Sequence, residues 1–292
     1  MTIVKFVFAV LCAAVAVNGA AANPDTITIC GGMPPAGWIT LSINGVCGKS
    51  GSTQLIGRTI RKIDALPPKT SLDVCGDPPP SGWITTAIRT CATVGSTPQK
   101  GRTILKIQGL PVNTSLTSCG DDTPPGWITT AISNASCSNF ASTSHIARTI
   151  RKIEGLPANT SVTSCGEAAP AGWITTAISN ASCSNFASTS HIARTIKKIE
   201  GLPPNASVDI CGDAPPAGWI TTAISSASCS SFASTNHQGR TMRKIAGMPI
   251  GSVVDVCGDP PPAGWVTIAA KGTCARFSGS TFNGATIKKI AQ

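Results

Sequence analysis

The sequence predicts an all-β, disulfide-stapled protein built as a tandem array of six repeats of about 45 residues, each with about three short strands. Three observations support this class: internal repetition, a regular cysteine spacing, and short runs rich in β-branched residues. The 25 residues from Gly126 to Ile150 recur unchanged from Gly172 to Ile196. Aromatic residues make up only 4% of the chain and tyrosine is absent, so small repeated cores are expected rather than one large core.

The N-terminus has the pattern of a secretory signal peptide. Lys5 precedes an apolar run from Phe6 to Val17, and small residues follow at Ala20 to Ala22. We therefore expect cleavage near Asn23 and a secreted, extracellular protein without a transmembrane segment. A lipid anchor at Cys12 is a weaker alternative, because Leu11 rather than a small residue precedes that cysteine.

Twelve cysteines remain once the predicted signal peptide is removed, and an even number in an exported chain favours disulfides over metal thiolates. Along the chain, short steps of 17, 16, 18, 18, 18 and 17 residues alternate with a constant step of 28. The cysteines are Cys30, Cys47, Cys75, Cys91, Cys119, Cys137, Cys165, Cys183, Cys211, Cys229, Cys257 and Cys274.

Two pairing schemes fit this spacing. Closing each short step leaves no thiol over, and a loop of this length would stabilise a repeat by about 3 kcal/mol. Closing the long steps would leave Cys30 and Cys274 free to join separate chains head to tail. The first scheme is favoured.

The first elements of a repeat are a short segment that ends in cysteine, a proline-containing turn, and a segment that starts at tryptophan. In repeat 5 the first segment alternates Val208 and Ile210, as a strand does. The segment Trp173–Ile178 predicts a second strand that alternates strictly, with Ile174, Thr176 and Ile178 on one face and Trp173, Thr175 and Ala177 on the other. The predicted bounds are 1–22 for the signal peptide and 26–63, 71–107, 115–153, 161–199, 207–245 and 253–290 for the repeats.

The last elements of a repeat are the interval from tryptophan to the second cysteine and a basic segment. All variation in repeat length falls in that interval, which predicts a loop tip. The basic segment, 148–153 in repeat 3, fits a strand better than a helix because it is short and rich in Thr and Ile. Beads on short linkers and a stacked array both remain open.

No constellation of catalytic residues stands out in the repeats. The histidines, His145, His191 and His237, share one phase of the repeat, and we expect them to be solvated loop residues. The turn acids, such as Asp77 and Asp213, are expected to cap their own turns. Neither group has partners spaced for metal binding, so we expect a non-enzymatic protein with no metal or cofactor.

Most of the positive charge lies at one phase of the repeat. The net charge is +10, or +9 without Lys5. A charged stripe would suit an acidic polysaccharide or another anionic surface, although a merely solubilising face is equally consistent with it. The basic segments contain Arg58, Arg61, Lys62, Arg102, Lys106, Arg148, Arg151, Lys152, Arg194, Lys197, Lys198, Arg240, Arg243, Lys244, Lys288 and Lys289.

One tryptophan per repeat lies eight residues after the first cysteine. It could form the core of its small unit or offer a stacking platform for a sugar ring, and the core is favoured. The six are Trp38, Trp83, Trp127, Trp173, Trp219 and Trp265.

Five Asn-x-Ser/Thr sequons are candidate glycosylation sites if the chain passes through a eukaryotic secretory pathway. Their asparagines are Asn113, Asn134, Asn159, Asn180 and Asn205.

These patterns together predict a secreted, multivalent binding or structural component that engages anionic polymers, with self-association as a further possibility. Nucleic acid is a less suitable partner for an exported chain. The alternative is a protease inhibitor or defence protein that presents disulfide-closed loops. Ice or mineral binding through paired threonines is disfavoured, because adjacent strand residues face opposite ways.

Overall fold

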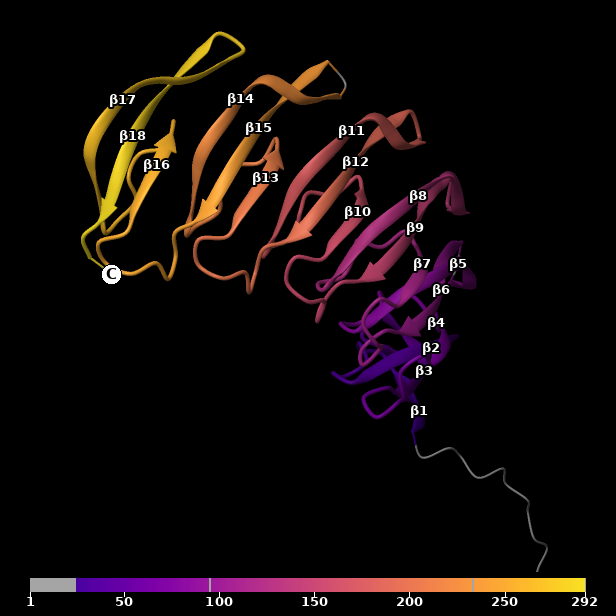
Figure 1. The fold of residues 1–292 in the computed structure, drawn as a ribbon. Helices are drawn as coiled ribbons and strands as arrows, with labels where there is room; N and C mark the ends of the chain where they lie inside the picture. Colours follow the sequence, from indigo (N-terminus) through magenta and orange to yellow (C-terminus); the bar gives the residue numbers. More distant parts are fainter. Residues whose placement is uncertain (1–24, 95, 233, 292) are drawn as a thin grey trace, which may run out of the picture. The chain divides into compact units, whose positions relative to one another are not determined.

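The computed structural model describes residues 25–94, 96–232 and 234–291, in two units divided between Ala65 and Leu66. All regular secondary structure in these ranges is β-strand. Six three-stranded sheets follow one another along the sequence (Figure 1). The predicted all-β, six-repeat fold class is confirmed. The predicted signal peptide lies outside the described residues.

Each repeat supplies a short strand of five residues, a long strand that begins at its tryptophan, and a third strand of ten residues. The short strands are β1 (Thr26–Cys30), β4 (Ser71–Cys75), β7 (Ser115–Cys119), β10 (Ser161–Cys165), β13 (Ser207–Cys211) and β16 (Val253–Cys257). The long strands are β2 (Trp38–Ser50), β5 (Trp83–Val94), β8 (Trp127–Phe140), β11 (Trp173–Phe186), β14 (Trp219–Phe232) and β17 (Trp265–Phe277). The third strands are β3 (Thr53–Lys62), β6 (Thr97–Lys106), β9 (Thr143–Lys152), β12 (Thr189–Lys198), β15 (Thr235–Lys244) and β18 (Ser280–Lys289).

The third strand lies in the centre of each sheet and pairs antiparallel with both others, as in the order β7-β9-β8. The basic segment is therefore a strand, as predicted. The long and third strands form a hairpin whose two-residue turn in repeat 3, Ala141 and Ser142, has positive φ at both residues. Such a turn matches the twist of the strands that it joins.

The interval before the second cysteine is part of the long strand, so its prediction as a loop tip is wrong. In repeat 3, Ile132 pairs with Arg148 and Ser136 pairs with Ile146, which leaves two extra residues on β8. The same region has one extra residue in β2 and β17 and none in β5. The strand therefore absorbs the difference between the 16-, 17- and 18-residue cysteine steps in bulges of different size.

A second irregularity overturns the predicted alternation of faces in Trp173–Ile178. Thr175 and Ala177 pair with the consecutive residues Ile196 and Thr195, so Thr176 is an extra residue. The alternation is interrupted because a bulge gives two residues on one strand a single partner position on the other.

All six disulfides lie within repeats, with Cα–Cα distances of 5.6 to 5.9 Å. The favoured pairing is confirmed, and the alternative with free Cys30 and Cys274 is wrong. Each bridge joins the two outer strands, and the first cysteine pairs with a small residue of the central strand, such as Gly101 in repeat 2. A Cβ atom added at Gly101 would lie 2.7 Å from Cys91 Cβ. The space beside the bridge is thus narrow, and every repeat has Gly or Ala at this position. The pairs are Cys30–Cys47, Cys75–Cys91, Cys119–Cys137, Cys165–Cys183, Cys211–Cys229 and Cys257–Cys274.

Repeats 2 to 6, in the unit that begins at Leu66, are stacked rather than strung out as beads. One sheet face, here the front face, carries the tryptophan and packs on the back face of the preceding repeat. At the junction of repeats 3 and 4, Trp173 and Ile196 of the front face meet Ile128 and Ile153 of the back face. Equivalent clusters form at the other three junctions within this unit.

The close approach of the disulfide to the central strand gives a test of the fold. We expect Gly101→Val to destabilise repeat 2 by about 1 to 3 kcal/mol, because the new side chain collides with the Cys75–Cys91 bridge. Gly272→Val is the matched control, since nothing lies within 4 Å of its added Cβ. Thermal unfolding of both variants measures the effect, and equal midpoints would contradict the packing described.

Candidate functional site

The tryptophans form the core rather than an exposed platform. Trp83, Trp127, Trp173, Trp219 and Trp265 are between 6% and 9% exposed. Their rings offer no open face on which a sugar could stack. Trp38 differs, since it is only half-buried.

The turn acids join neighbouring repeats, which corrects the expectation that they cap their own turns. The backbone N–H of Thr175 in repeat 4 donates to Asp213 Oδ2 in repeat 5, at 2.8 Å. The same bond runs from Thr85 to Asp121 and from Thr221 to Asp259. The bulge explains this contact, because it interrupts the backbone pairing beside the threonine.

The acid at the junction of repeats 3 and 4 is a glutamate. The longer side chain of Glu167 accepts from the Thr129 hydroxyl at 2.7 Å as well as from its N–H at 3.4 Å. Thr175 Oγ1 is buried and has no such bond. Repeat 1 has Gly32 at the acid position. No feature of the sequence showed that these acids reach across a junction.

Many of the basic residues predicted to bind a ligand instead donate hydrogen bonds to backbone carbonyls of the turn of their own repeat or of the linker before it. The first arginine of the segment donates to the carbonyl of the turn acid, as Arg148 does to Asp121 O at 2.6 Å. The last lysine donates to a carbonyl of the preceding linker, as Lys152 does to Leu110 O at 2.7 Å. The same bonds are made by Arg102, Arg194, Lys106, Lys198, Lys244 and Lys289.

The basic residue directly before the last lysine of the segment makes no hydrogen bond that is common to all repeats. We call Arg151, Lys197, Arg243 and Lys288 the outer cation row, since they occupy one position in four stacked sheets. Three are half-buried and Lys288 is exposed. Arg151 makes one bond, to Asn113 Oδ1 at 2.8 Å, which leaves most of its five donors free for another acceptor.

One member of the row lines a cavity between repeats 5 and 6. The cavity measures about 440 Å³, and Arg243, Thr222 and Asp255 contribute to its lining. Lys271 lies 2.6 Å from Asp255, and this contact holds the pKa of the carboxyl below its ordinary value. The acid is therefore paired with its own cation, and Arg243, which makes no ion pair within the part of the chain that the structure describes, adds positive charge to the cavity.

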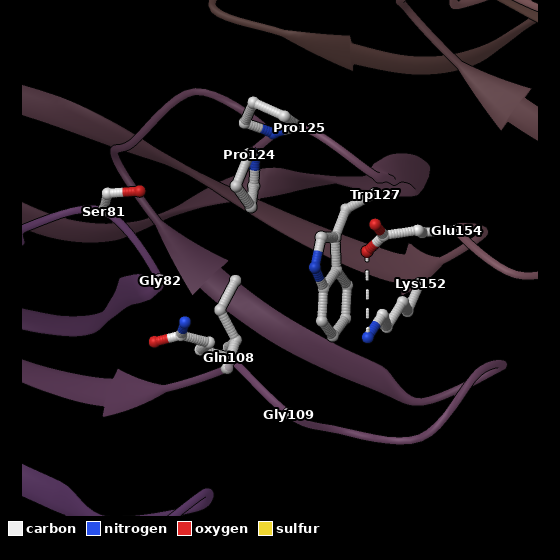
Figure 2. Close-up of a pocket in the computed structure, with 10 residues that line it drawn as sticks. Ser81, Gly82, Gln108, Gly109, Pro124, Pro125, Trp127, Lys152 and Glu154 are labelled. Carbon is white, nitrogen blue, oxygen red and sulfur yellow. Dashed lines mark ion pairs between the residues drawn. The ribbon is translucent and has the colours of Figure 1, made fainter. Parts of the chain in front are cut away.

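A second kind of cavity recurs where a tryptophan edge meets the preceding repeat. Between repeats 2 and 3 it measures about 250 Å³, and Figure 2 shows the Trp127 ring beside Lys152 and Glu154, opposite Gln108. Lys152 Nζ lies 3.9 Å from Glu154 Oε2 and also donates to Leu110 O. An equivalent cavity of about 370 Å³ lies between repeats 3 and 4. Lys198 Nζ in the second cavity also lies 3.9 Å from Glu200 Oε2, so in both cavities the lysine and the glutamate are already paired.

The expectation of solvated loop histidines is wrong. All three histidines lie on third strands; His191 and His237 are half-buried, and His145 is 8% exposed. His145 lies beside Gly120 of its own repeat, a glycine that Ile88 of the preceding repeat also approaches. Burial lowers the pKa of His145 below its ordinary value; nearby Lys100 and Arg102 lower it further, and Asp121 opposes them.

The five sequon asparagines are exposed and fall into two sets. Asn113, Asn159 and Asn205 lie in linkers with φ near +70°, a conformation that asparagine tolerates better than most residues. Asn134 Oδ1 instead accepts from Ser184 Oγ and from a backbone N–H of the next repeat, and Asn180 makes the same contacts. The linker asparagines thus have a conformational reason to be present, apart from any glycan.

Comparisons with family models, with curated proteins and with solved structures found no match. Within the described ranges, no group of three or more His, Cys, Asp or Glu side chains is arranged to hold a metal ion. No helix long and apolar enough to cross a membrane occurs in that part of the chain.

We expect Asp213→Ala to loosen the junction of repeats 4 and 5, because the Thr175 N–H loses its acceptor. A lost hydrogen bond to a partly buried charged group corresponds to about 1 to 2 kcal/mol. Amide hydrogen exchange at Thr175 should therefore become roughly tenfold faster or more. Glu200→Gln, at an exposed carboxylate, is the control, and unchanged exchange in Asp213→Ala would show that the bond is unimportant.

The buried histidine predicts acid sensitivity. Unfolded His145 binds a proton near pH ~6.5, whereas the folded side chain, with its lowered pKa, resists protonation. Its contribution to stability is therefore complete above that pH and is lost as pH falls below it. Thermal midpoints at pH 7.5 and 5.0 should show a smaller fall for His145→Gln than for the natural chain, since Gln99 fills this position in repeat 2. An equal fall would assign the sensitivity to other groups.

Proposed function

We propose that this chain is an exported, non-enzymatic repeat protein that binds an anionic polymer or surface at several points through the outer cation row. The observation that carries the proposal is the repetition of one cation at one position in four stacked sheets. Acidic polysaccharide is the partner class that we favour.

The stack favours a polymeric partner over a small one. Sheets packed face to face lie about 10 Å apart, so consecutive cations of the row present regularly spaced charges. Each exposed contact contributes only about 0.2 to 1 kcal/mol. Several contacts with one polymer add through effective concentration, because the first holds the others nearby.

The other basic residues of the segments in repeats 2 to 6 are already used in hydrogen bonds within the fold. The first arginine and last lysine of a segment already donate to backbone carbonyls, so the binding surface is narrower than the whole segment. The net charge of +9, which remains once Lys5 leaves with the predicted signal peptide, helps to attract a polyanion before contact is made.

The disulfides support export. Six bridges form within the described residues, and such bonds persist in oxidising compartments. In the predicted secretory route, the segment from residue 1 to 22 directs the chain out of the cell. The inhibitor alternative has less support, because the disulfide-closed interval lies largely in a strand and not in a projecting loop.

The proposal is tested by neutralising the row. We expect the combined variant Arg151→Gln, Lys197→Gln, Arg243→Gln and Lys288→Gln to bind heparin about thirtyfold more weakly, taking about 0.5 kcal/mol for each lost contact. Binding measured from 50 to 500 mM NaCl should also show a shallower salt dependence than that of the natural chain.

The matched control removes the same charge elsewhere, at Lys49, Lys69, Lys100 and Arg276. If this control weakens binding as much as the row variant, the effect comes from net charge and not from the row. If natural binding does not change with salt, the electrostatic proposal is wrong.

A further inference from the structure

Exposed large hydrophobic side chains gather in repeats 1 and 6. Of the exposed large hydrophobic residues in the described ranges, Val112 is the one that lies in another part of the chain. The others are Ile27, Met33 and Val46 in repeat 1, and Ile250, Val253, Val266, Ile268 and Ile290 in or next to repeat 6.

The back face of repeat 6 has the side chains that form junctions elsewhere. In repeat 5, Ile220 and Ile245 are 2% and 5% exposed because they pack under Trp265 of the next repeat. Their equivalents in repeat 6, Val266 and Ile290, are 36% and 55% exposed. The back face of repeat 6 thus has the apolar residues that receive a front face elsewhere, and they are exposed.

The apolar residues of this back face are placed differently from those inside the stack: Ala270 stands where repeat 5 has Ile224, and an isoleucine appears at another position. Repeats 2 to 5 have threonine at the bulge position, as at Thr222, whereas repeat 6 has Ile268, which is 51% exposed. A face that meets only water normally carries polar residues. An added isoleucine therefore indicates that another surface covers it.

The front face of repeat 1 is of the kind that this surface receives inside the stack; it is covered at its central residue Ile60, which is 0% exposed, and open at the outer strand β1. Ile27 pairs with Ile60 as Val162 pairs with Ile196 in repeat 4, so it holds the position that enters a junction. Ile27 is 45% exposed, whereas Val162 is 5% exposed. Trp38, at the position that fills the centre of every described junction, is only half-buried.

We propose that the back face of repeat 6 in one molecule receives the front face of repeat 1 in a second copy of this chain. This contact would continue an interface that the stack already contains, because each of the four junctions within residues 66–291 joins these same two kinds of surface. Different patches meet in this contact, so it is heterologous and extends into a linear head-to-tail assembly.

The intermolecular joint is weaker than a junction inside the stack. Inside, the turn acid accepts the N–H of a threonine in the preceding repeat, and repeat 1 has Gly32 in place of that acid. The joint also lacks the covalent linker that holds internal repeats together. Assembly is therefore reversible and depends on concentration.

The test uses the chain from Asn23 onward, studied by sedimentation from 1 to 200 µM. The average mass of the natural protein should rise with concentration through multiples of one protomer. Val266→Asp, on the back face, and Ile27→Asp, on the front face, should each reduce it to a single protomer. Both side chains are exposed, and Val112→Asp, at an exposed linker residue, should leave the association unchanged.

A mixture of the two single-face variants tests the geometry. Each retains one good surface, so an equimolar mixture should form dimers and nothing larger. A natural chain that stays monomeric to 200 µM would overturn the proposal. Association that survives Ile27→Asp but not Val266→Asp would also overturn it, because that pattern means back-to-back contact. Intact mass under non-reducing conditions and circular dichroism confirm that the variants fold.

Discussion

The whole stack depends on the burial of both faces of a very small sheet. A three-stranded unit of about 40 residues cannot enclose a core of its own, and here its two faces are both apolar. The solution in repeats 2 to 6 is to place the tryptophan face of one sheet on the isoleucine face of the sheet before it. Each core thus belongs to a pair of repeats, and stability is shared between neighbours.

Polar groups complete this arrangement. The bulge at Thr175 leaves a backbone N–H that Asp213 of the next repeat accepts, so an irregularity in one sheet becomes a link to another. Arg148 and Lys152 hold the turn and the linker of their own repeat in the same way. Charge that looked like a uniform binding stripe is therefore divided between internal bonds and the outer cation row.

The candidate functions follow from this division. The outer cation row lies on the regularly spaced sheets, where a long anionic partner can reach several cations. The uncovered faces of repeats 1 and 6 instead offer apolar surfaces like those inside the stack. The two surfaces meet at Lys288, which pairs with Val266 of the back face of repeat 6. Ionic strength weakens the charge contacts of the row, whereas kosmotropic salts strengthen the apolar contacts.

The sequence by itself determined the fold class and the repeat period, and it favoured the disulfide pairing that the structure then confirmed. These properties follow from patterns over short stretches of sequence: the cysteine steps, the β-branched runs, and a tryptophan at a constant distance from its cysteine. Only the tertiary structure decided which strand is central, where the bulges lie, that His145 is buried, and that Asp213 meets a neighbouring repeat. Contacts between repeats depend on the register of paired strands, and one extra residue in a strand changes which side chains face the neighbour.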